Sequence, residues 1–565
     1  MSEKEKKTVK LEIRKNGEKI DEIEAAVGTP FTELAKPYDN DPKCRILICL
    51  TGYRIRELFR TVEEDHTTVD FLTAENFNGY RAMERALVFI LVRAVCDLFG
   101  LESVVRVQYS LDKGVLCNIS PYVGWLDEKA VDQIRERMKE IVAADEKFEK
   151  YKMETEGVKA LLLSSKYTKS KVKLLDYRNK PVSSIYKLGD LWDYFYGALP
   201  PSTGCVPVFD VKMVDGSVIL RLPTAADPRK LPEFEHNHLL NETFKETDKW
   251  MDMIQIPYVA YLNRSIEKGT YRRVIQVSEA MHEKKIAQIA DSIVSTRKRV
   301  VLIAGPSSSG KTSFDQRLGV QLNVHGRKVT ALSTDDYFVD REFVEKDEKG
   351  NYKFEDLEAV DVKLFNEQMN ALLAGKEVDI PVYNFLEGKK EFGKRITKMD
   401  ENETLIIEGI HGLNEKLTKN IQAKDKFKIY ISPLTALGVD AHNRIYTSDA
   451  RIFRRLVRDA RTRGKTAKES LKTWSVVRAG EEKNIFPFQE EADMMFNSAL
   501  PYELAVLKKY AEPLLREVKE EDPEYIDAQR LLKMLSYFLE LPDESAILNN
   551  SLLKEFIGGT CLFED

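Results

Sequence analysis

The stretch Arg-Val-Val-Leu-Ile-Ala-Gly-Pro-Ser-Ser-Ser-Gly-Lys-Thr occupies residues 299–312 and decides the fold of the second half of the chain. Its end, residues 305–312, matches G-x-x-x-x-G-K-[ST], a loop whose backbone N–H groups hold phosphate oxygens. The apolar run Arg299–Ala304 before it is typical of a buried parallel strand. After it, apolar residues recur at helical spacing, and Gly326 stands where a helix would end. Strand, loop and helix in this order predict a nucleotide-binding α/β domain.

The loop also predicts which residues contact the nucleotide. Backbone N–H groups and the helix N-terminus would point at phosphate oxygens. Lys311 would reach the outer phosphates, and Thr312 would offer its hydroxyl to Mg²⁺. We therefore expect ATP (or GTP) and Mg²⁺ as cofactors, with the nucleotide bound by Gly305, Ser307, Ser308, Ser309, Gly310, Lys311, Thr312 and Ser313.

Length and composition limit the class of protein. A chain of 565 residues predicts several domains, since one domain takes about 100–200 residues. The net charge of −5 gives no global support for binding nucleic acid or membranes. Scattered cysteines without a C-x-x-C pair are typical of reduced thiols, and the N-terminus does not resemble a signal peptide. The apolar run Ala86–Val95 is too short to span a bilayer. We expect a cytoplasmic protein without membrane contact.

Carboxylates end two further strand-like runs. Thr330–Ser333 is followed by Asp335, which would then face the γ-phosphate and could deprotonate an acceptor hydroxyl. A turn or helix-cap role is the alternative for this residue. Glu408 ends the run Thr404–Ile407, which fits a carboxylate near Mg²⁺. An ordinary charge at a strand end is the alternative there.

Basic residues crowd the segment Arg451–Lys465. At helical spacing Arg451, Arg454, Arg458 and Arg461 share one face. Such a face is either solvated or the arginine-rich lid of a phosphoryl-transfer site, where planar donors stabilise charge on the transferring group.

Residues 299–500 resemble the uridine kinases and the related phosphoribulokinases. The resemblance implies an α/β kinase that transfers the γ-phosphoryl group of ATP to the 5′-hydroxyl of a ribonucleoside. The motifs that carry it, in the family's order, are Gly-Pro-Ser-Ser-Ser-Gly-Lys-Thr at 305–312, Leu-Ser-Thr-Asp-Asp-Tyr-Phe at 332–338, Ile-Pro-Val-Tyr-Asn-Phe at 380–385, Ile-Ile-Glu-Gly-Ile-His at 406–411 and Arg-Arg-Leu-Val-Arg-Asp at 454–459.

The resemblance implies roles for individual residues. Asp335 matches the general base, with Lys311 as the second catalytic residue and Glu408 near the metal. Gly388 stands where the family has a base-reading His, which predicts an altered base preference. The remaining matches are the substrate-binding residues Phe354, Glu355, Tyr383, Phe385 and Arg455 and the lid residues Arg458 and Arg463.

The first half of the chain carries different patterns. Alternating residues on both sides of Asn16-Gly17 predict a β-hairpin. Residues 8–72 resemble the TGS module, a β-grasp domain. Residues 80–245 resemble the second N-terminal domain of threonyl-tRNA synthetase, which edits mischarged tRNA. Arg85 and Phe89 stand where that domain has its two histidines, so we expect no editing chemistry.

We therefore predict an α/β protein in four parts. These are a TGS β-grasp domain (1–75), a synthetase-like α+β domain (76–270), a P-loop kinase domain with a parallel sheet flanked by helices (271–540) and a tail on the surface (541–565). The predicted partner is a nucleoside, while RNA contact through the TGS module and homo-oligomerisation stay open. Two other functions stay open as well. One is a kinase acting on a sugar phosphate or another small alcohol, and the other is a nucleotide-binding regulator associated with RNA or tRNA.

Overall fold

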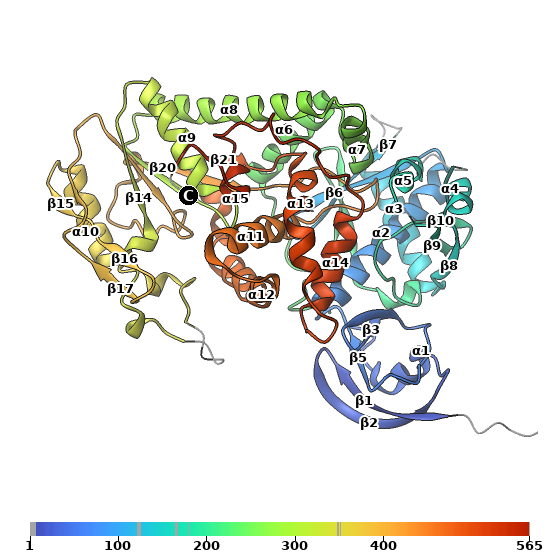
Figure 1. The fold of residues 1–565 in the computed structure, drawn as a ribbon. Coiled ribbons are helices and arrows are strands. Elements are labelled where there is room, and N and C mark those ends of the chain that lie inside the picture. Colours follow the sequence, from blue (N-terminus) through green and yellow to red (C-terminus); the bar gives the residue numbers. More distant parts are fainter. Residues whose placement is uncertain are drawn as a thin grey trace, which may run out of the picture.

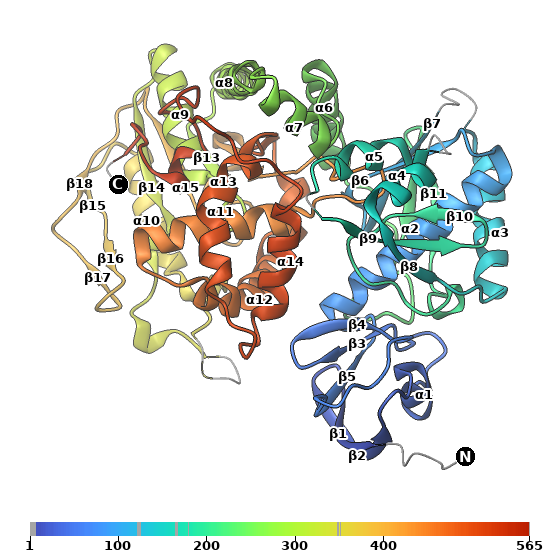
Figure 2. The same cartoon turned by 45° about the vertical axis from the view of Figure 1, so that its right-hand side comes forward.

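The computed structural model describes residues 7–120, 126–163, 168–178, 180–346, 350 and 352–563. A small sheet module, a larger α+β part and a helix-covered parallel sheet follow one another along the chain (Figures 1 and 2). Among the residues described, no helix is both long and apolar enough to cross a membrane. The domain boundaries given above remain predictions.

The N-terminal module is a mixed sheet with strand order β2-β1-β5-β3-β4. Asn16 (φ 52°) and Gly17 (φ 91°) form the turn between β1 and β2, because a two-residue hairpin turn needs positive φ at both positions. The predicted hairpin is confirmed, whereas assignment to the TGS family stays a prediction. The elements are β1 (Thr8–Lys15), β2 (Glu18–Ala26), α1 (Phe31–Ala35), β3 (Ile48–Thr51), β4 (Arg54–Glu57) and β5 (Thr68–Leu72).

Helix α2 (Phe77–Phe99) is the core of the second part and is buried on most sides. Asn76 caps it by accepting a hydrogen bond from the Asn78 N–H at 2.9 Å. A sheet of order β11-β12-β7-β6 and a smaller sheet of order β10-β9-β8 complete this part. The elements are β6 (Val104–Leu111), β7 (Gly114–Ser120), α3 (Glu128–Ala143), β8 (Glu149–Glu154), α4 (Thr155–Leu163), α5 (Lys169–Leu175), β9 (Val182–Leu188), β10 (Leu191–Asp193), β11 (Asp210–Val214) and β12 (Ser217–Arg221).

The two α2 residues that stand in place of the editing histidines, Arg85 and Phe89, make structural contacts. Arg85 donates two hydrogen bonds to the carbonyl oxygen of Ala198, at 3.0 and 2.8 Å. Phe89 is fully buried, and its ring lies 5.9 Å from that of Phe148 and 5.3 Å from that of Phe195. Arg85 therefore links the helix to the backbone at Ala198, and Phe89 packs in the core around the helix.

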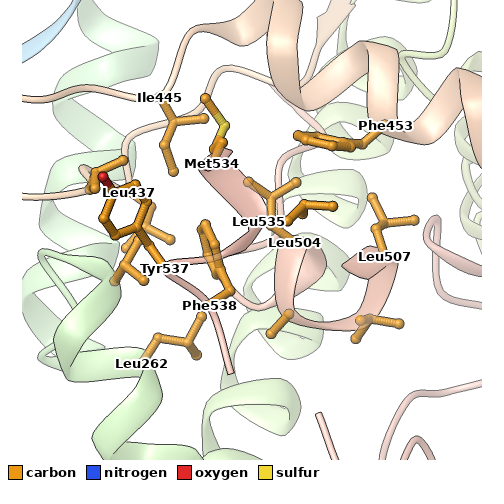
Figure 3. Close-up of a cluster of buried hydrophobic side chains, with 14 of the residues drawn as sticks. Leu262, Leu437, Ile445, Phe453, Leu504, Leu507, Met534, Leu535, Tyr537 and Phe538 are labelled. Atoms are coloured by element: carbon orange, nitrogen blue, oxygen red, sulfur yellow. The ribbon is translucent and has the colours of Figure 1, made fainter. Parts of the chain in front are cut away.

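Three helices lead into the parallel sheet: α6 (His238–Ile254), α7 (Val259–Glu267) and α8 (Tyr271–Ser295). The segment that forms α7 is short and partly polar, so its local sequence pattern indicates a helix only weakly. In the structure Leu262 is fully buried and Ile266 nearly so, in the core cluster that Figure 3 shows in part. A narrow apolar stripe is enough to stabilise a short helix when neighbouring helices bury that stripe.

The second half is built on a parallel sheet of order β14-β19-β13-β20-β21. Alternate residues of a strand face opposite sides. Val301 and Ile303 pack against α8 and α9, whereas Val300 and Leu302 pack on the other face, where α10 lies. This confirms the predicted sheet flanked by helices. The elements are β13 (Val300–Ala304), α9 (Lys311–Val324), β14 (Val329–Ser333), α10 (Val362–Leu373), β19 (Thr404–Glu408), β20 (Lys426–Ser432) and β21 (Met494–Asn497).

The last helices pack together beside this sheet (Figures 1 and 3). Two of these helices, α13 and α14, follow β21 in the chain. The tail packs onto the domain through Leu552, Leu553 and Phe556, which are fully buried, while many of its other residues are exposed. The elements are α11 (Thr447–Arg463), α12 (Ala467–Asn484), α13 (Glu503–Arg516), α14 (Tyr525–Leu535) and α15 (Lys554–Ile557).

Buried ion pairs fasten α2 to the start of α11. Arg81 donates to both carboxylate oxygens of Asp449, at 2.9 and 2.8 Å. Arg444 forms a matching pair with Glu84, at 2.8 and 3.0 Å. Burial of such groups is tolerated only when their hydrogen bonds are made, so these contacts fix how the two halves of the protein meet.

Candidate functional site

The loop between β13 and α9 has the backbone shape that phosphate binding requires. Ser308 (φ 60°) and Gly310 (φ 87°) both adopt the left-handed conformation. A Cβ atom on Gly305 would lie 2.1 Å from the carbonyl oxygen of Ile431, so only glycine fits there. The Lys311 ammonium donates to the carbonyl oxygens of Gly305 and Pro306, at 3.1 and 3.4 Å. The loop thus curls around its own lysine at the N-terminus of α9.

The sheet register brings the predicted acidic residues to the same edge. Glu408 pairs with Ile303 of β13 and with Ser333 of β14, so it lies level with the ends of both strands. The Thr312 hydroxyl lies 3.4 and 3.5 Å from the two Glu408 carboxylate oxygens. Desolvation raises the pKa of Glu408 to about 7, and the Lys311 charge opposes this rise.

The hydroxyl of Thr312 and the carboxylate of Glu408 fit a magnesium site. Mg²⁺ prefers hard oxygen ligands and is usually held by one or two carboxylates together with substrate phosphates and water. Two oxygen-bearing groups already lie together beside the phosphate loop. A cation would also relieve the desolvation that raises the pKa of Glu408.

Asp335 and Asp336 differ in their surroundings. Asp336 forms an ion pair with Arg395 at 3.3 Å. Asp335 is exposed as a whole residue, but protein atoms surround its carboxylate, which makes no ion pair within the described part of the chain. Loss of solvation raises the pKa of Asp335, Lys311 opposes the rise and Asp336 adds to it. Of the two, Asp335 therefore has the free carboxylate near Lys311.

Two of the four arginines on the predicted face of α11, Arg451 and Arg454, face inward, so the interpretation of a solvated face is wrong for these two. Arg458 is partly buried and Arg461 is exposed. Arg451 and Arg454 are almost completely buried. Arg451 donates to the carbonyl oxygen of Ser307 at 2.9 Å and pairs with Glu481. Arg454 donates to the carbonyl oxygen of Ser498 at 2.7 Å and pairs with Glu503. These side chains hold the phosphate loop against the helices behind it.

The three arginines expected at the substrate or lid are placed differently. Arg455 is buried and donates to the Ser307 hydroxyl at 3.2 Å, so it reaches the phosphate loop. Arg458 contacts the Asp459 carboxylate at 2.8 Å. Arg463 is half exposed and lies 3.5 Å from Asp459. Arg463 also lowers the pKa of Asp335, so its charge acts at the predicted base.

Aromatic side chains line the other side of the site. The Phe338 ring lies 5.4 Å from Phe354, 5.6 Å from Tyr383 and 6.4 Å from Phe385. Tyr383 is buried, whereas Phe385 is 58% exposed. Glu355 is close enough to Glu481 and Asp335 for their charges to add to its desolvation, and its pKa rises to about 7. The predicted substrate residues therefore come together, with a carboxyl group beside an apolar surface.

The conformation and surroundings of Gly388 constrain which residue can stand at this position. It lies between β16 (Val382–Asn384) and β17 (Lys389–Glu391) with φ 73°. A Cβ atom there would lie 2.7 Å from Cβ of Arg341 and 2.8 Å from its Nε. Arg341 also donates to the carbonyl oxygens of Phe385 and Leu386. The positive φ and the closeness of Arg341 both favour glycine at this position, so a His side chain would require Arg341 and the backbone to shift.

Three acidic residues of the site were missed by the sequence analysis. Glu481 accepts from the Ser307 N–H at 2.9 Å. Glu555 accepts from the Ser313 hydroxyl at 2.8 Å and lies 3.3 Å from its backbone nitrogen. Asp315 is buried, and desolvation raises its pKa to about 7. Of these three residues, only Asp315 could have been predicted from the sequence, because it lies in the first turns of the helix that follows the phosphate loop.

Comparisons with known proteins concern the part of the chain that contains this site. Residues 300–504 match the Phosphoribulokinase / Uridine kinase family, and this region is a domain of that family. The uridine kinase of Staphylococcus epidermidis is 28% identical over 197 residues, which are 35% of this chain and 86% of that protein. The uridine kinase of Staphylococcus aureus is 29% identical over 198 residues, with the same coverage. A solved structure from Silicibacter sp. is 16% identical and covers 37% of this chain and 98% of its own, with a TM-score of 0.26.

Proposed function

We propose that this P-loop kinase transfers the γ-phosphoryl group of ATP to the 5′-hydroxyl of a ribonucleoside. The observation that carries the proposal is the free carboxylate of Asp335 near Lys311, at the end of the sheet where the phosphate loop begins. Kinase family membership supports the phosphotransferase reaction. The two staphylococcal relatives bear the name uridine kinase, which supports a nucleoside acceptor.

Each residue then has a defined task. The loop N–H groups and Lys311 hold the phosphates and offset the charge that develops on the transferring group. Asp335 accepts the proton of the attacking hydroxyl, which makes that oxygen a better nucleophile. Thr312 and Glu408 would hold Mg²⁺, which neutralises phosphate charge when bound. Arg455 and Arg463 add positive charge on the acceptor side.

The acceptor side favours a neutral nucleoside over a sugar phosphate. Phe385 is exposed and Phe354 partly so, and these two rings offer aromatic surface to a base, while the buried Tyr383 ring packs against Phe385. Glu355 can accept hydrogen bonds from ribose hydroxyls and would repel a phosphate. Lys389 and Lys390 follow Gly388, and two lysines could meet an anionic substrate, but Lys390 pairs with Asp361 at 2.6 Å. That ammonium is thus already neutralised by a carboxylate.

A phosphate-transfer assay tests the proposal. Purified full-length protein is given ATP or GTP, Mg²⁺ and, one at a time, the ribonucleosides, their 2′-deoxy counterparts and a set of sugar phosphates. We expect ribonucleoside 5′-monophosphates as products and slower turnover of 2′-deoxyribonucleosides, because Glu355 loses a hydrogen-bond partner. Phosphorylation of a sugar phosphate but no nucleoside would contradict the proposal.

A further inference from the structure

The C-terminal segment, residues 549–561, packs against the start of α9. A Cβ atom on Gly310 would lie 3.0 Å from Cδ2 of Leu552, so this leucine touches the phosphate loop. On the other side, Arg461 of α11 donates to the backbone carbonyls of Glu555 and Phe556, at 3.0 and 3.3 Å. In Figure 2, α15 lies next to α11. The segment is therefore held between the phosphate loop and the arginine helix.

Glu555 places its carboxylate on donors that a nucleotide would use. It accepts from the Ser313 hydroxyl at 2.8 Å and lies 3.3 Å from the Ser313 backbone nitrogen. Ser313 is in the first turn of α9, where N–H groups have no partner within the helix. In a loop of this pattern such donors hold phosphate oxygens, and the helix dipole favours a negative charge there. A carboxylate oxygen, like a phosphate oxygen, is a negatively charged hydrogen-bond acceptor and can bind the same donors.

The charge of Glu555 also acts on Glu408, the predicted metal-binding carboxylate. Glu555, Asp315 and Asp335 all add to the rise in the pKa of Glu408, with Lys311 as the opposing charge. A triphosphate would bring further negative charge to this place. Glu555 and a bound nucleotide would therefore repel each other unless the segment moved away.

We propose that the C-terminal segment is an autoinhibitory latch, in which the Glu555 carboxylate occupies Ser313 and a nucleotide phosphate must displace it. The proposal rests on the proposed function only in needing the loop to bind a nucleoside triphosphate. It does not depend on the acceptor. Glu555 occupies the donors of a single loop residue, Ser313, so the latch weakens nucleotide binding and does not abolish it.

The direct test is Glu555→Gln in the full-length protein. Calorimetry measures binding of ATP and of inorganic tripolyphosphate, which has no base. A hydrogen bond to a charged group contributes a factor of about ten or more to an equilibrium constant. The substitution removes the charge from the group that competes for Ser313, so the variant should bind both probes about tenfold more tightly. Glu544→Gln is the matched control, because Glu544 belongs to the same tail but contacts Tyr510 and Lys509. The control should bind as wild type does.

A second measurement follows the segment itself. Cys561 is exposed, whereas the other five cysteines are buried, so a thiol-reactive fluorophore will label this position selectively. Tripolyphosphate should change the emission of the labelled wild-type protein as the segment leaves α9. Equal affinities of wild type and Glu555→Gln, or weaker binding by the variant, would overturn the latch alone. If neither protein binds ATP or tripolyphosphate, the proposed function fails with it.

Discussion

Replacement of Asp335 by Asn should leave nucleotide binding intact and slow phosphoryl transfer. The substitution keeps the size of the side chain and removes only its ability to accept the hydroxyl proton. Asp335 makes no ion pair in the described part of the chain, so no partner is left uncompensated. A general base contributes about 10²–10⁴ in rate. At 1.36 kcal/mol per factor of ten, this is a barrier increase of about 3–5 kcal/mol.

The assay is single-turnover transfer from labelled ATP to a ribonucleoside, with ATP affinity measured separately. Asp336→Asn is the matched control, because Asp336 pairs with Arg395 and should affect local packing more than the chemistry. The pH profile adds a second readout. Desolvation raises the pKa of Asp335, and a base must be deprotonated, so the wild-type rate should fall as pH drops through that pKa. Full turnover by Asp335→Asn would refute the assignment and make Asp336 the candidate.

Three further predictions follow from the structure. The affinity for Mg²⁺ should rise as the pH increases through about 7. The pKa of Glu408 is raised to about 7, and its carboxyl group must lose a proton before it can bind the metal ion. Calorimetry in buffers of different ionisation enthalpy would detect this proton release. Asp449→Asn should lower the free energy of unfolding by about 3–5 kcal/mol, because Arg81 then stays buried without its counter-charge; denaturant titration measures this, and a loss below 1 kcal/mol would contradict it. Arg81 and Arg530 hold the pKa of Asp449 down at about 2, so its contribution to stability is present above the ordinary carboxyl pKa and is lost as pH falls towards 2. Gly388→Ala should lower the melting temperature, since φ 73° and the closeness of Arg341 both oppose a side chain; an unchanged melting temperature would show that the hairpin tolerates one.

The phosphate loop could be predicted from the sequence because its chemistry is local. The strand, the glycines and Lys311 are consecutive, and the same residues that bind phosphate also set the backbone shape. Asp335 and Glu408 could be predicted for a related reason. Each ends an apolar run, and parallel strands bring their carboxyl ends to one edge of the sheet.

The contacts that were missed join residues far apart in the chain. Glu481 and Glu555 reach the loop from α12 and α15, and no local pattern marks either as a partner of Ser307 or Ser313. The arginine face of α11 was ambiguous for the same reason. Helical spacing places the side chains on one face, but only tertiary packing decides whether that face meets water or protein.

Helix α7 and the tail show how short elements depend on their surroundings. Leu262 of α7 is buried by neighbouring helices, although its own segment is polar and short. The tail has a weak pattern, yet Leu552 and Phe556 fill gaps beside α9 and α11. Burial of such residues is a property of the assembled core, so composition alone underestimates it.

Product analysis of single-turnover reactions tests the central claim most directly. Full-length protein is mixed with γ-labelled ATP, Mg²⁺ and an equimolar set of ribonucleosides and sugar phosphates, with Lys311→Ala as the inactive reference. The account predicts label on the 5′-oxygen of at least one ribonucleoside, none on the sugar phosphates and none with Lys311→Ala. Label on a sugar phosphate alone, or transfer that survives in Lys311→Ala, would contradict it.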